Sequence, residues 1–585
     1  MEKDNEKIKS KPKSVLGIHD GHNSTVAVLQ NGELTDVLQE ERLIGEKNIG
    51  DFPKNALNDV VERNDLLSDN PLVSFNGLYM RYGVWGRKAI LDDYGKSKSI
   101  ASSLKAIVKK NPTIYSLYKS SQSKNRLAMT DNTLKIPHTR IFSVEHHTAH
   151  AAAAYYGWGK KGKILALTCD GNGDGLSATV NICENDKIDR IAAITEDHSI
   201  GRLYAFITYL MGMMPLEHEY KIMGLAPYSG ISRDVIRVQE KFSKLFEFDS
   251  KKNGLEWRRS DGVPTLYAPQ QFLDKLIQRE RFDWIAAGLQ LFIENFLKQW
   301  VQNCIRETGI RRVALSGGVF MNVKANKIIY ELPEVDELFI FPSCGDESNA
   351  IGSAYYTYQD NFQDDIQPLT GIYFGKAIDD QEVERTIAAH AASTHVQVKY
   401  KDDIENEIAK LLAAGKIVGR IKGKMEYGAR SLGNRSILAN ASMPGVIRII
   451  NEMIKNRDFW MPFAPSVLAE TSEKYFIKPK PVVSPYMMLS FDTRPEMYER
   501  IMAALHPFDY TARPQEVVKD WNPDYHKLIK YYEEYTGDSI ILNTSYNLHG
   551  FPIAYSAKQA LDVFQNSGLR FLALGNFLLS KEDTN

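Results

Sequence analysis

Two histidines stand four residues apart at the start of an alanine-rich segment, EHHTAHAAAAYYGW. Residues i and i+4 share one face of a helix, so His146 and His150 are spaced to chelate one metal ion, whereas His147 points about 100° away. Two imidazoles do not complete a coordination sphere, so oxygen ligands must come from elsewhere. The alternative is a group of solvated histidines at the head of a helix.

Two aspartates in glycine-containing loops are candidates to complete that set. Asp170 is expected to end an apolar strand in KILALTCD, and Asp346 is expected at the end of another strand, in FPSCGDES. Carboxylates in such loops can bind a metal while nearby N–H groups bind phosphate oxygens. Two histidines and two aspartates together favour Fe(II), Mn(II) or Zn(II). Ordinary turn formation is the alternative for each loop.

Asp20 and His22 occupy the first predicted turn, in HDGHNS. A histidine near its ordinary pKa can deprotonate an alcohol, and a neighbouring aspartate can fix its tautomer or accept the proton. Both are therefore candidate acid–base residues. Solvated turn residues are the alternative.

The segment SGGVFMN follows an apolar strand and opens a helix. Gly317 and Gly318 allow a ligand to approach the backbone closely, and the start of a helix, here near Asn322, favours an anion. The segment matches neither the dinucleotide-binding fingerprint nor the Walker motif.

A second group of cations is concentrated among glycines in KGKMEYGARSLGNRSILA and in NEMIKNRDFW. In a chain of nearly zero net charge, this indicates a site for a phosphorylated small molecule. The alternative, solvated charge, fits poorly because apolar residues alternate with the arginines. The polar segment NTSYNLHG either lines the same pocket or forms a turn. The candidate ligand-binding residues here are Lys424, Arg430, Arg435, Lys455, Asn543 and Ser545, with Lys422 and Arg457 nearby.

Mixed α/β elements are predicted to position these residues. Strands over 14–20, 24–30 and 33–41 form hairpins joined by a GHN turn and an Asn31-Gly32 turn. Residues 311–329 and 336–356 each read as a buried strand, a turn and a helix. A domain boundary is placed near Leu369, and a second unit with buried strands KIVGRI and DSIILNT runs to the end. The charged residues 1–14 are expected to be a disordered tail.

Composition narrows the classes of function. The chain has 585 residues, 43% of them hydrophobic, which is enough for two or more domains. Its formal net charge of -1 argues against nucleic acid as a partner. Four cysteines without a CxxC pair argue against a disulfide framework. With no long apolar run and no signal-like start, a cytoplasmic protein without a membrane partner is expected.

The chain resembles the NodU/CmcH carbamoyltransferase family in eight ordered blocks that cover almost its whole length. These blocks are LGIHDGHNSTVAVLQNGE, QEERL, VEHHTAHAAAAYY, YKIMGLAPY, SGGVFMN, MEYGARSLGNRSILA, PFAPS and LNTSYNLHGFPI. The resemblance implies an actin-like ATPase (ASKHA-type) domain over 15–369, which binds a metal and transfers carbamoyl. It also implies a YrdC-like α/β domain over 370–585, which forms carbamoyl-adenylate.

The activity that the resemblance implies is ATP-dependent O-carbamoylation. Carbamoyl phosphate and ATP would give carbamoyl-adenylate, whose carbamoyl group passes to a hydroxyl of a small-molecule natural product. Matching positions imply Fe(II) ligands, with Mn or Zn as substitutes and Mg accompanying ATP. The implied ligands are His146, His150, Asp170 and Asp346; the implied catalytic residues are Asp20 and His22; and the implied carbamoyl phosphate and ATP residues are Arg430, Arg435, Lys455 and Ser545.

The sequence departs from the family pattern at three places. Ala429 replaces the usual proline of GPRALG, Met461 replaces the usual arginine before PFAP, and Gly45 stands where a basic residue is usual. A tRNA threonylcarbamoyl-transfer enzyme would share the metal site, but it would not need the second domain and usually has a basic surface. A sugar kinase would transfer phosphate through Mg(II) without a histidine pair. A non-enzymatic scaffold would need none of these side chains.

Overall fold

The computed structural model describes residues 13–79, 86–95, 112–266, 269–390 and 396–581. It shows an α/β protein with mixed sheets, as the sequence predicts. A disordered tail is predicted for residues 1–14, of which residues 1–12 lie outside the described part of the chain. Ser14 already begins the first strand, so the tail was placed too far along the chain at that end.

The first sheet is built from β1 (Ser14–His19), β2 (Thr25–Gln30), β3 (Glu33–Gln39), β4 (Leu72–Asn76) and β5 (Ile141–Val144), in the order β3-β2-β1-β4-β5. The predicted hairpins are confirmed, since β1 pairs antiparallel with β2 and β2 with β3. Asn31 and Gly32 both take positive φ, as a two-residue hairpin turn requires. The accompanying helices are α1 (Glu40–Ile44), α2 (Lys54–Asn64), α3 (Arg87–Gly95) and α5 (Pro112–Leu134).

A second sheet repeats the order of the first. It is built from β6 (Ile164–Gly173), β7 (Leu176–Glu184), β8 (Lys187–Thr195), β11 (Arg312–Ser316) and β12 (Glu337–Ile340), in the order β12-β11-β6-β7-β8. In both sheets three antiparallel strands are followed by two parallel ones. Its helices are α7 (Ile200–Leu210), α8 (Glu219–Leu225), α9 (Arg233–Ser243), α10 (Gln270–Ile277), α11 (Phe282–Thr308) and α12 (Val323–Tyr330).

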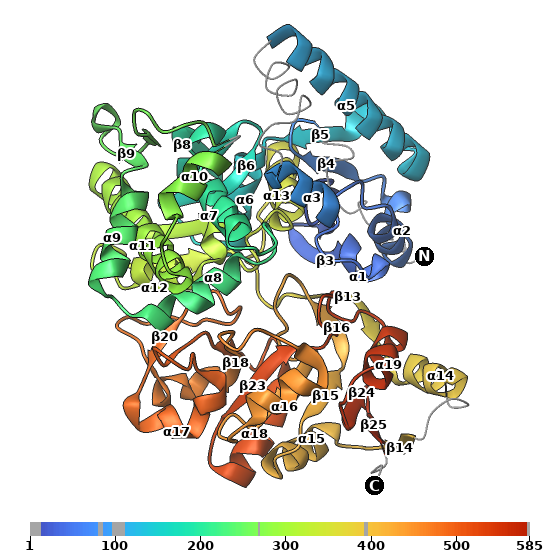
Figure 1. The fold of residues 1–585 in the computed structure, drawn as a ribbon. Helices are drawn as coiled ribbons and strands as arrows, with labels where there is room; N and C mark the ends of the chain where they lie inside the picture. The colour runs from blue at the N-terminus through green and yellow to red at the C-terminus, as the bar shows by residue number, and fades with distance from the viewer. Residues whose placement is uncertain (1–12, 80–85, 96–111, 267–268, 391–395, 582–585) are drawn as a thin grey trace, which may run out of the picture.

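Two buried helices lie between these sheets, α6 (His146–Trp158) and α13 (Ser348–Phe362) (Figure 1). They cross so closely that a Cβ on Gly352 would lie 1.9 Å from the carbonyl oxygen of Ala149. The run Ala151 to Ala154 is fully buried, so small side chains allow this approach. The contact fixes the start of α6, where the histidines stand, against the start of α13.

The C-terminal part is built on an eight-stranded mixed sheet within the described residues, in the order β14-β25-β24-β15-β17-β23-β18-β22. Both predicted buried strands are confirmed, as β15 and β23. The strands are β14 (Val396–Tyr400), β15 (Val418–Ile421), β17 (Arg435–Ala439), β18 (Ala464–Leu468), β22 (Gln515–Val517), β23 (Ile540–Ser545), β24 (Phe571–Leu574) and β25 (Phe577–Lys581). The helices include α14 (Asp380–His390), α15 (Ile404–Ala413), α16 (Val446–Ile450), α17 (Tyr498–Ile501), α18 (Pro523–Thr536) and α19 (Ala557–Gln565).

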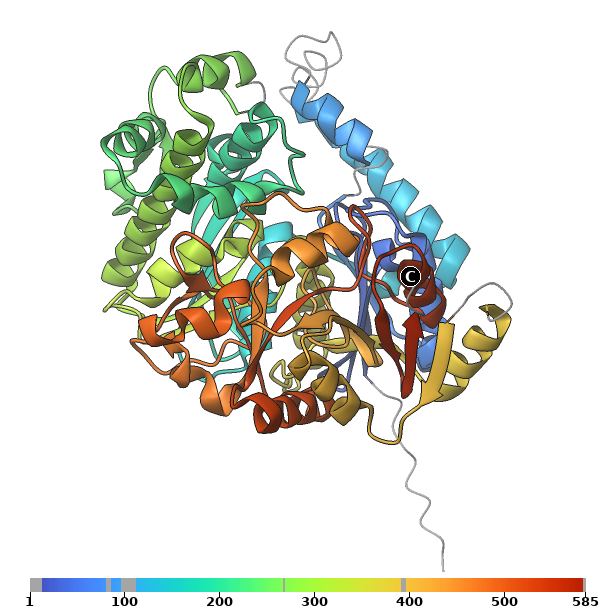
Figure 2. The ribbon, with the colours of Figure 1, turned by 60° about the horizontal axis from the view of Figure 1, so that its bottom comes forward.

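The C-terminal part lies beneath both sheet units in Figure 1 and in front of both in Figure 2. Leu369, where the sequence places the domain boundary, lies between α13 and β13 (Tyr373–Ile378), which pairs with β16 (Gly423–Glu426). Side chains join the parts across this seam, for example Lys221 with Asp458 at 2.9 Å. Among the described residues, no helix has both the length and the apolar character that crossing a membrane requires.

Candidate metal centre and anion cavity

The structure brings together the two histidines and two aspartates that the sequence predicts as candidate metal ligands. Ligand atoms of His146, His150, Asp170 and Asp346 all lie within 4.8 Å of one another. Nε2 of His146 is 3.4 Å from Asp170 Oδ2 and 3.5 Å from Asp346 Oδ1, and Nε2 of His150 is 3.9 Å from the same Asp346 oxygen. Four donors converging on one point form a candidate metal centre.

Local structure explains how each ligand reaches this point. Glu145 caps α6 by accepting from the backbone N–H groups of His147 and Thr148, which fixes the first turn of the helix. Asp170 does not end its strand as predicted, because β6 continues to Gly173 with a register shift after Cys169 that interrupts the pairing. Asp346 is not at a strand end either. It lies in the loop between β12 and α13.

A second layer of hydrogen bonds orients these ligands. The Nδ1 atom of His150 is 3.1 Å from Ser316 Oγ, which leaves Nε2 directed toward the aspartates. The N–H of Gly318 donates to Asp170 Oδ1 at 2.9 Å, so the anion that the predicted glycine loop binds is a carboxylate of the chain itself. The amide nitrogen of Asn349 is 3.1 Å from His150 Nε2, and among the described residues no donor reaches Asn349 Oδ1.

The charges in this centre are strongly perturbed. Burial lowers the pKa of His146, but Asp346 and Asp170 outweigh that effect and raise it to about 9. Burial together with Asp170 raises the pKa of Asp346 to about 8. Burial alone would raise the pKa of Asp170, but the hydrogen bond with His146 holds that pKa far below the usual range. Carboxylates and imidazoles forced together in this way fit a bound divalent cation.

The first turn lies beside this centre but is arranged differently from the prediction. Both carboxylate oxygens of Asp20 accept from Arg126, at 2.7 and 2.8 Å, and both side chains are buried. His22 is buried rather than solvated, and burial lowers its pKa to about 4 against the opposing charges of Asp170, Glu41 and Glu217. Burial therefore favours a neutral His22 imidazole, the form that accepts a proton.

His19 is a neighbour of this centre that sequence reasoning missed. Its Nε2 atom lies 3.8 Å from Asp346 Oδ2 and 2.9 Å from the carbonyl oxygen of His22. Asn76 contacts its Nδ1 atom at 2.9 Å. The sequence contains only a weak indication of a functional role for His19, because a single histidine at the end of an apolar strand is usually part of a core.

A cavity of about 370 Å³ opens at the seam between the two parts of the chain. Its lining carries Lys and Arg side chains from both sides of the predicted boundary, including Lys47 and Arg87 from one and Lys455 and Arg457 from the other. Glu217, which lines the cavity, opposes the lowering of the pKa of His22, as Asp170 of the candidate metal centre also does. The remaining lining residues are His218, Tyr220, Lys221, Asp458, Met461, Ser545, Asn547, His549 and Gly550.

Lys455 is the most deeply buried cation of the cavity wall. Its ammonium group donates to Ser545 Oγ at 3.2 Å and to Asn547 Oδ1 at 2.7 Å. Burial lowers its pKa well below the ordinary value, and Arg457 and Lys47 add to that effect. The structure thus joins the end of NEMIK to the segment NTSYN, although 90 residues separate Lys455 from Ser545.

Arg457 of the cavity wall forms a cluster with two further arginines, Arg430 and Arg513. They are close enough for Arg430 and Arg457 to lower the pKa of Arg513 further after burial has lowered it. In the described part of the chain, no acceptor lies within hydrogen-bonding distance of Nε of Arg430 or Arg513. Half-buried guanidinium groups whose Nε–H lacks an acceptor fit an anionic ligand, while Arg457 donates to Thr544 Oγ1 at 3.1 Å. The sequence did not reveal Arg513, because it stands alone in TARPQEV.

The other predicted ligand-binding residues are not among those that line the cavity. Arg435 is fully buried and donates to the carbonyl oxygens of Lys422, Asn434 and Gly423. Asn543 binds Ser431 and Ser466 inside the sheet. Asn322 caps α12 and bonds Gln290. Lys424 is exposed on β16, and Gly317 allows close contact, since a Cβ there would lie 2.3 Å from the Cys169 carbonyl oxygen.

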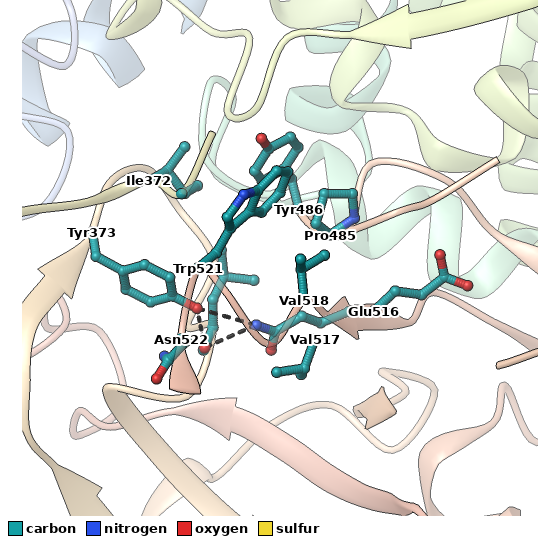
Figure 3. Close-up of a pocket in the computed structure, with 12 residues that line it drawn as sticks. Ile372, Tyr373, Pro485, Tyr486, Glu516, Val517, Val518, Trp521 and Asn522 are labelled. Atoms are coloured by element: carbon teal, nitrogen blue, oxygen red, sulfur yellow. Dashed lines mark hydrogen bonds between the residues drawn. The ribbon is translucent and has the colours of Figure 1, made fainter. Parts of the chain in front are cut away.

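A second, much smaller cavity (Figure 3) is lined in part by Leu432, which follows Arg430 by two residues. The hydroxyl of Tyr373 and the amide of Gln515 both donate to the carbonyl oxygen of Leu432 at 2.8 Å. The rings of Tyr486 and Trp521 stack beside it. Its volume of about 10 Å³ holds about one water molecule. This region therefore fixes the cationic loop and is too small for a substrate.

Fold and site together define an α/β protein with a candidate metal centre of two histidines and two aspartates, and with a cavity lined by cations. Comparison with family models matches residues 14–355 to the carbamoyltransferase N-terminus and residues 409–581 to the carbamoyltransferase C-terminus. The chain belongs to the carbamoyltransferase family and is a carbamoyltransferase enzyme.

Curated relatives support that assignment. Nodulation protein NolO of Bradyrhizobium diazoefficiens is 30% identical over 445 residues, which cover 75% of this chain and 79% of the relative. Nodulation protein NolNO of Sinorhizobium fredii is 30% identical over 448 residues, 76% of this chain and 64% of the relative. A crystal structure of full-length HypF matches 60% of this chain and 56% of HypF at 16% identity, with a TM-score of 0.31, too low to support an argument.

Proposed function

We propose that this protein is an ATP-dependent O-carbamoyltransferase that forms carbamoyl-adenylate and passes its carbamoyl group to a hydroxyl of a small-molecule natural product. The observation that carries the proposal is the seam cavity. Cations from both parts of the chain line it, and one of them, Arg457, belongs to an arginine cluster in which Nε of Arg430 and of Arg513 has no acceptor among the described residues. A carbamoyl donor and a nucleotide are both phosphorylated, so such a cavity suits them.

The proposed reaction balances in three steps. Water cleaves carbamoyl phosphate to carbamate and phosphate. A carbamate oxygen attacks the α-phosphorus of ATP, and the bond to the β-phosphate oxygen breaks to release pyrophosphate. The acceptor oxygen then attacks the carbamoyl carbon, its proton passes to a base, and AMP leaves.

Each group of residues has a task in this scheme. The arginine cluster and Lys455 hold phosphate oxygens, and Ser545 and Asn547 fix the lysine ammonium. His22, favoured in its neutral form, receives the acceptor proton. Asp20 holds Arg126 and so fixes the turn, which makes it a positioning residue. His146, His150, Asp170 and Asp346 would hold Fe(II), with Mn(II) or Zn(II) as substitutes, and the ion would supply Lewis-acid polarisation.

The fold accommodates this division of labour. The repeated strand order of the first two sheets is that expected of an actin-like ATPase domain, and we assign residues 15–369 to it. We assign residues 370–585, with their eight-stranded sheet, to a YrdC-like domain. Each half-reaction would then belong mainly to one part of the chain, with the cavity between them.

The experiment that tests the proposal identifies the products. Purified protein is incubated with ATP, carbamoyl phosphate and a panel of hydroxylated metabolites, and mass spectrometry searches for a carbamoyl mass increase. Phosphate, pyrophosphate and AMP should accumulate in the same reaction. Release of ADP instead of AMP would contradict the adenylate intermediate.

A further inference from the structure

Five aromatic side chains gather at the seam beside the cavity, and we call them the aromatic platform: Tyr228, Phe282, Phe459, Trp460 and Phe508. Phe459 packs edge-on against Trp460 at 5.0 Å and against Tyr228 at 6.0 Å between ring centroids. Tyr228 in turn contacts Phe508 at 5.6 Å. Phe282 contacts Trp460 at 6.3 Å and completes the group.

The platform is open to solvent although it is apolar. Phe459 is 75% exposed, Phe508 48% and Phe282 43%. Isolated exposed apolar residues are ordinary, but a contiguous exposed aromatic cluster usually marks a binding surface. Residues from both parts of the chain build it, since Tyr228 and Phe282 precede the predicted boundary and the other members follow it.

The platform is continuous with the cavity along two segments. Asp458 and Met461 line the cavity, and Phe459 and Trp460 stand between them in the chain. On the facing side, Tyr220 and Lys221 line the cavity at the start of α8, which leads into the short 3-10 helix Ala226–Ser229 that carries Tyr228. At about 1.5 Å per residue in α8 and about 2.0 Å in the 3-10 helix, Tyr228 follows Tyr220 by up to about 14 Å along the chain. This is the scale of a substrate of two or three rings.

We propose that the aromatic platform binds the acceptor substrate by stacking against an apolar ring face, while the acceptor hydroxyl enters the cavity. This inference rests on the proposed function and specifies its acceptor class. Ring faces stack on exposed aromatic side chains with useful affinity. Adenine fits less well as the occupant, because a small ligand is normally enclosed, whereas a face as open as Phe459 suits the body of a larger molecule.

The test compares two glucosides that differ only in the aglycone, 4-nitrophenyl β-D-glucopyranoside with an aromatic ring and methyl β-D-glucopyranoside without one. Ligand-observed NMR measures their dissociation constants with the wild type, Phe459→Ser, and Tyr535→Ser as control. Tyr535 is 46% exposed on α18, outside the platform. The nitrophenyl compound should bind the wild type about tenfold more tightly, and Phe459→Ser should remove that advantage while Tyr535→Ser retains it.

Three outcomes would overturn the inference. The first is equal binding of the two glucosides, or binding unaffected by Phe459→Ser. The second is a raised KM for ATP in pyrophosphate formation by Phe459→Ser, which would identify adenine as the occupant. The third is a change in oligomeric state by light scattering, which would identify a second copy of the chain. Absence of pyrophosphate from every variant, with the binding difference intact, would instead contradict the proposed function alone.

Discussion

The backbone N–H of Ala429 donates a hydrogen bond to Ser343 Oγ, 3.1 Å away, across the seam between the two parts of the chain. The contact is tight, since a Cβ on Gly428 would lie 2.3 Å from that of Ser343. Arg42 also donates to the carbonyl oxygen of Gly428, at 2.6 Å. Ser343 precedes Asp346 by three residues, so the loop of the arginine cluster is joined directly to the loop of the metal centre.

This bond depends on a residue that departs from the family pattern. A proline at position 429 has no N–H to donate, so Ala429→Pro should lose the bond and about 1 kcal/mol of unfolding free energy. Carbamoyl transfer should slow more than pyrophosphate formation, because the two loops are no longer held together. Thermal unfolding and paired rate measurements check this, with Ala429→Ser, which keeps the N–H, as control. Identical behaviour of the two variants would show that the bond has no role.

The metal centre predicts about one transition-metal ion per chain. Anaerobically purified protein should contain Fe(II) or a substitute by elemental analysis, because imidazole and carboxylate ligands suit these ions. His146→Ala should lose most of the metal. His138→Ala should keep it, since that histidine is exposed and pairs with Asp131 elsewhere. Full transfer activity in metal-free protein would rule the centre out as a catalytic one.

The two half-reactions should be separable at Arg430. Arg430→Ala removes one guanidinium from the arginine cluster and should block pyrophosphate formation, because phosphate oxygens lose a charged donor. Supplied with synthetic carbamoyl-adenylate, the variant should still carbamoylate the acceptor. Failure of that rescue would mean that Arg430 also serves transfer.

His22→Ala should show the opposite behaviour. Pyrophosphate formation should continue, while transfer slows by on the order of 10² to 10⁴ through loss of the proton acceptor. Release of pyrophosphate and carbamoylation of the acceptor are measured side by side. Loss of both in this variant would contradict the division of labour.

Substitution of Asp20 should lower the stability of the protein as well as the rate of transfer. Asp20→Ala leaves Arg126 buried without its carboxylate partner, which should cost about 3 to 5 kcal/mol of unfolding free energy. The double variant with Arg126→Met should recover much of that loss. Denaturant unfolding of the wild type and the two variants measures both free-energy changes. A fully stable Asp20→Ala protein with slow transfer would instead make Asp20 a direct participant.

Glu219 predicts a pH dependence of stability. Burial raises the pKa of its carboxyl from 4.5 to about 7, so the folded protein retains a proton that the unfolded chain loses. The resulting stability is fully present below pH 4.5 and is lost as pH rises to about 7. Glu219→Gln mimics the protonated acid, so its Tm should exceed that of the wild type at pH 8 and approach it at pH 4.5. The exposed Glu247→Gln is the control, and an unchanged difference across this range would refute the assignment.

Several features followed from sequence alone, because they depend on local periodicity and turn chemistry. The hairpins of β1 to β3, the strand and helix around SGGVFMN, and the shared face of His146 and His150 all rest on residues close in the chain. Spacing within one helix fixes which side chains meet. The pairing of the two histidines was predictable for that reason, and their clustering with Asp170 and Asp346 agrees with the predicted set.

Tertiary structure decided the contacts between distant segments. Arg513 joins Arg430 and Arg457, and Asp20 binds Arg126, through packing that no local pattern encodes. Arg435 looked like a phosphate ligand in sequence, yet its guanidinium is held by backbone carbonyls. A buried cation needs hydrogen-bond acceptors, and the tertiary structure determines which acceptors lie within its reach.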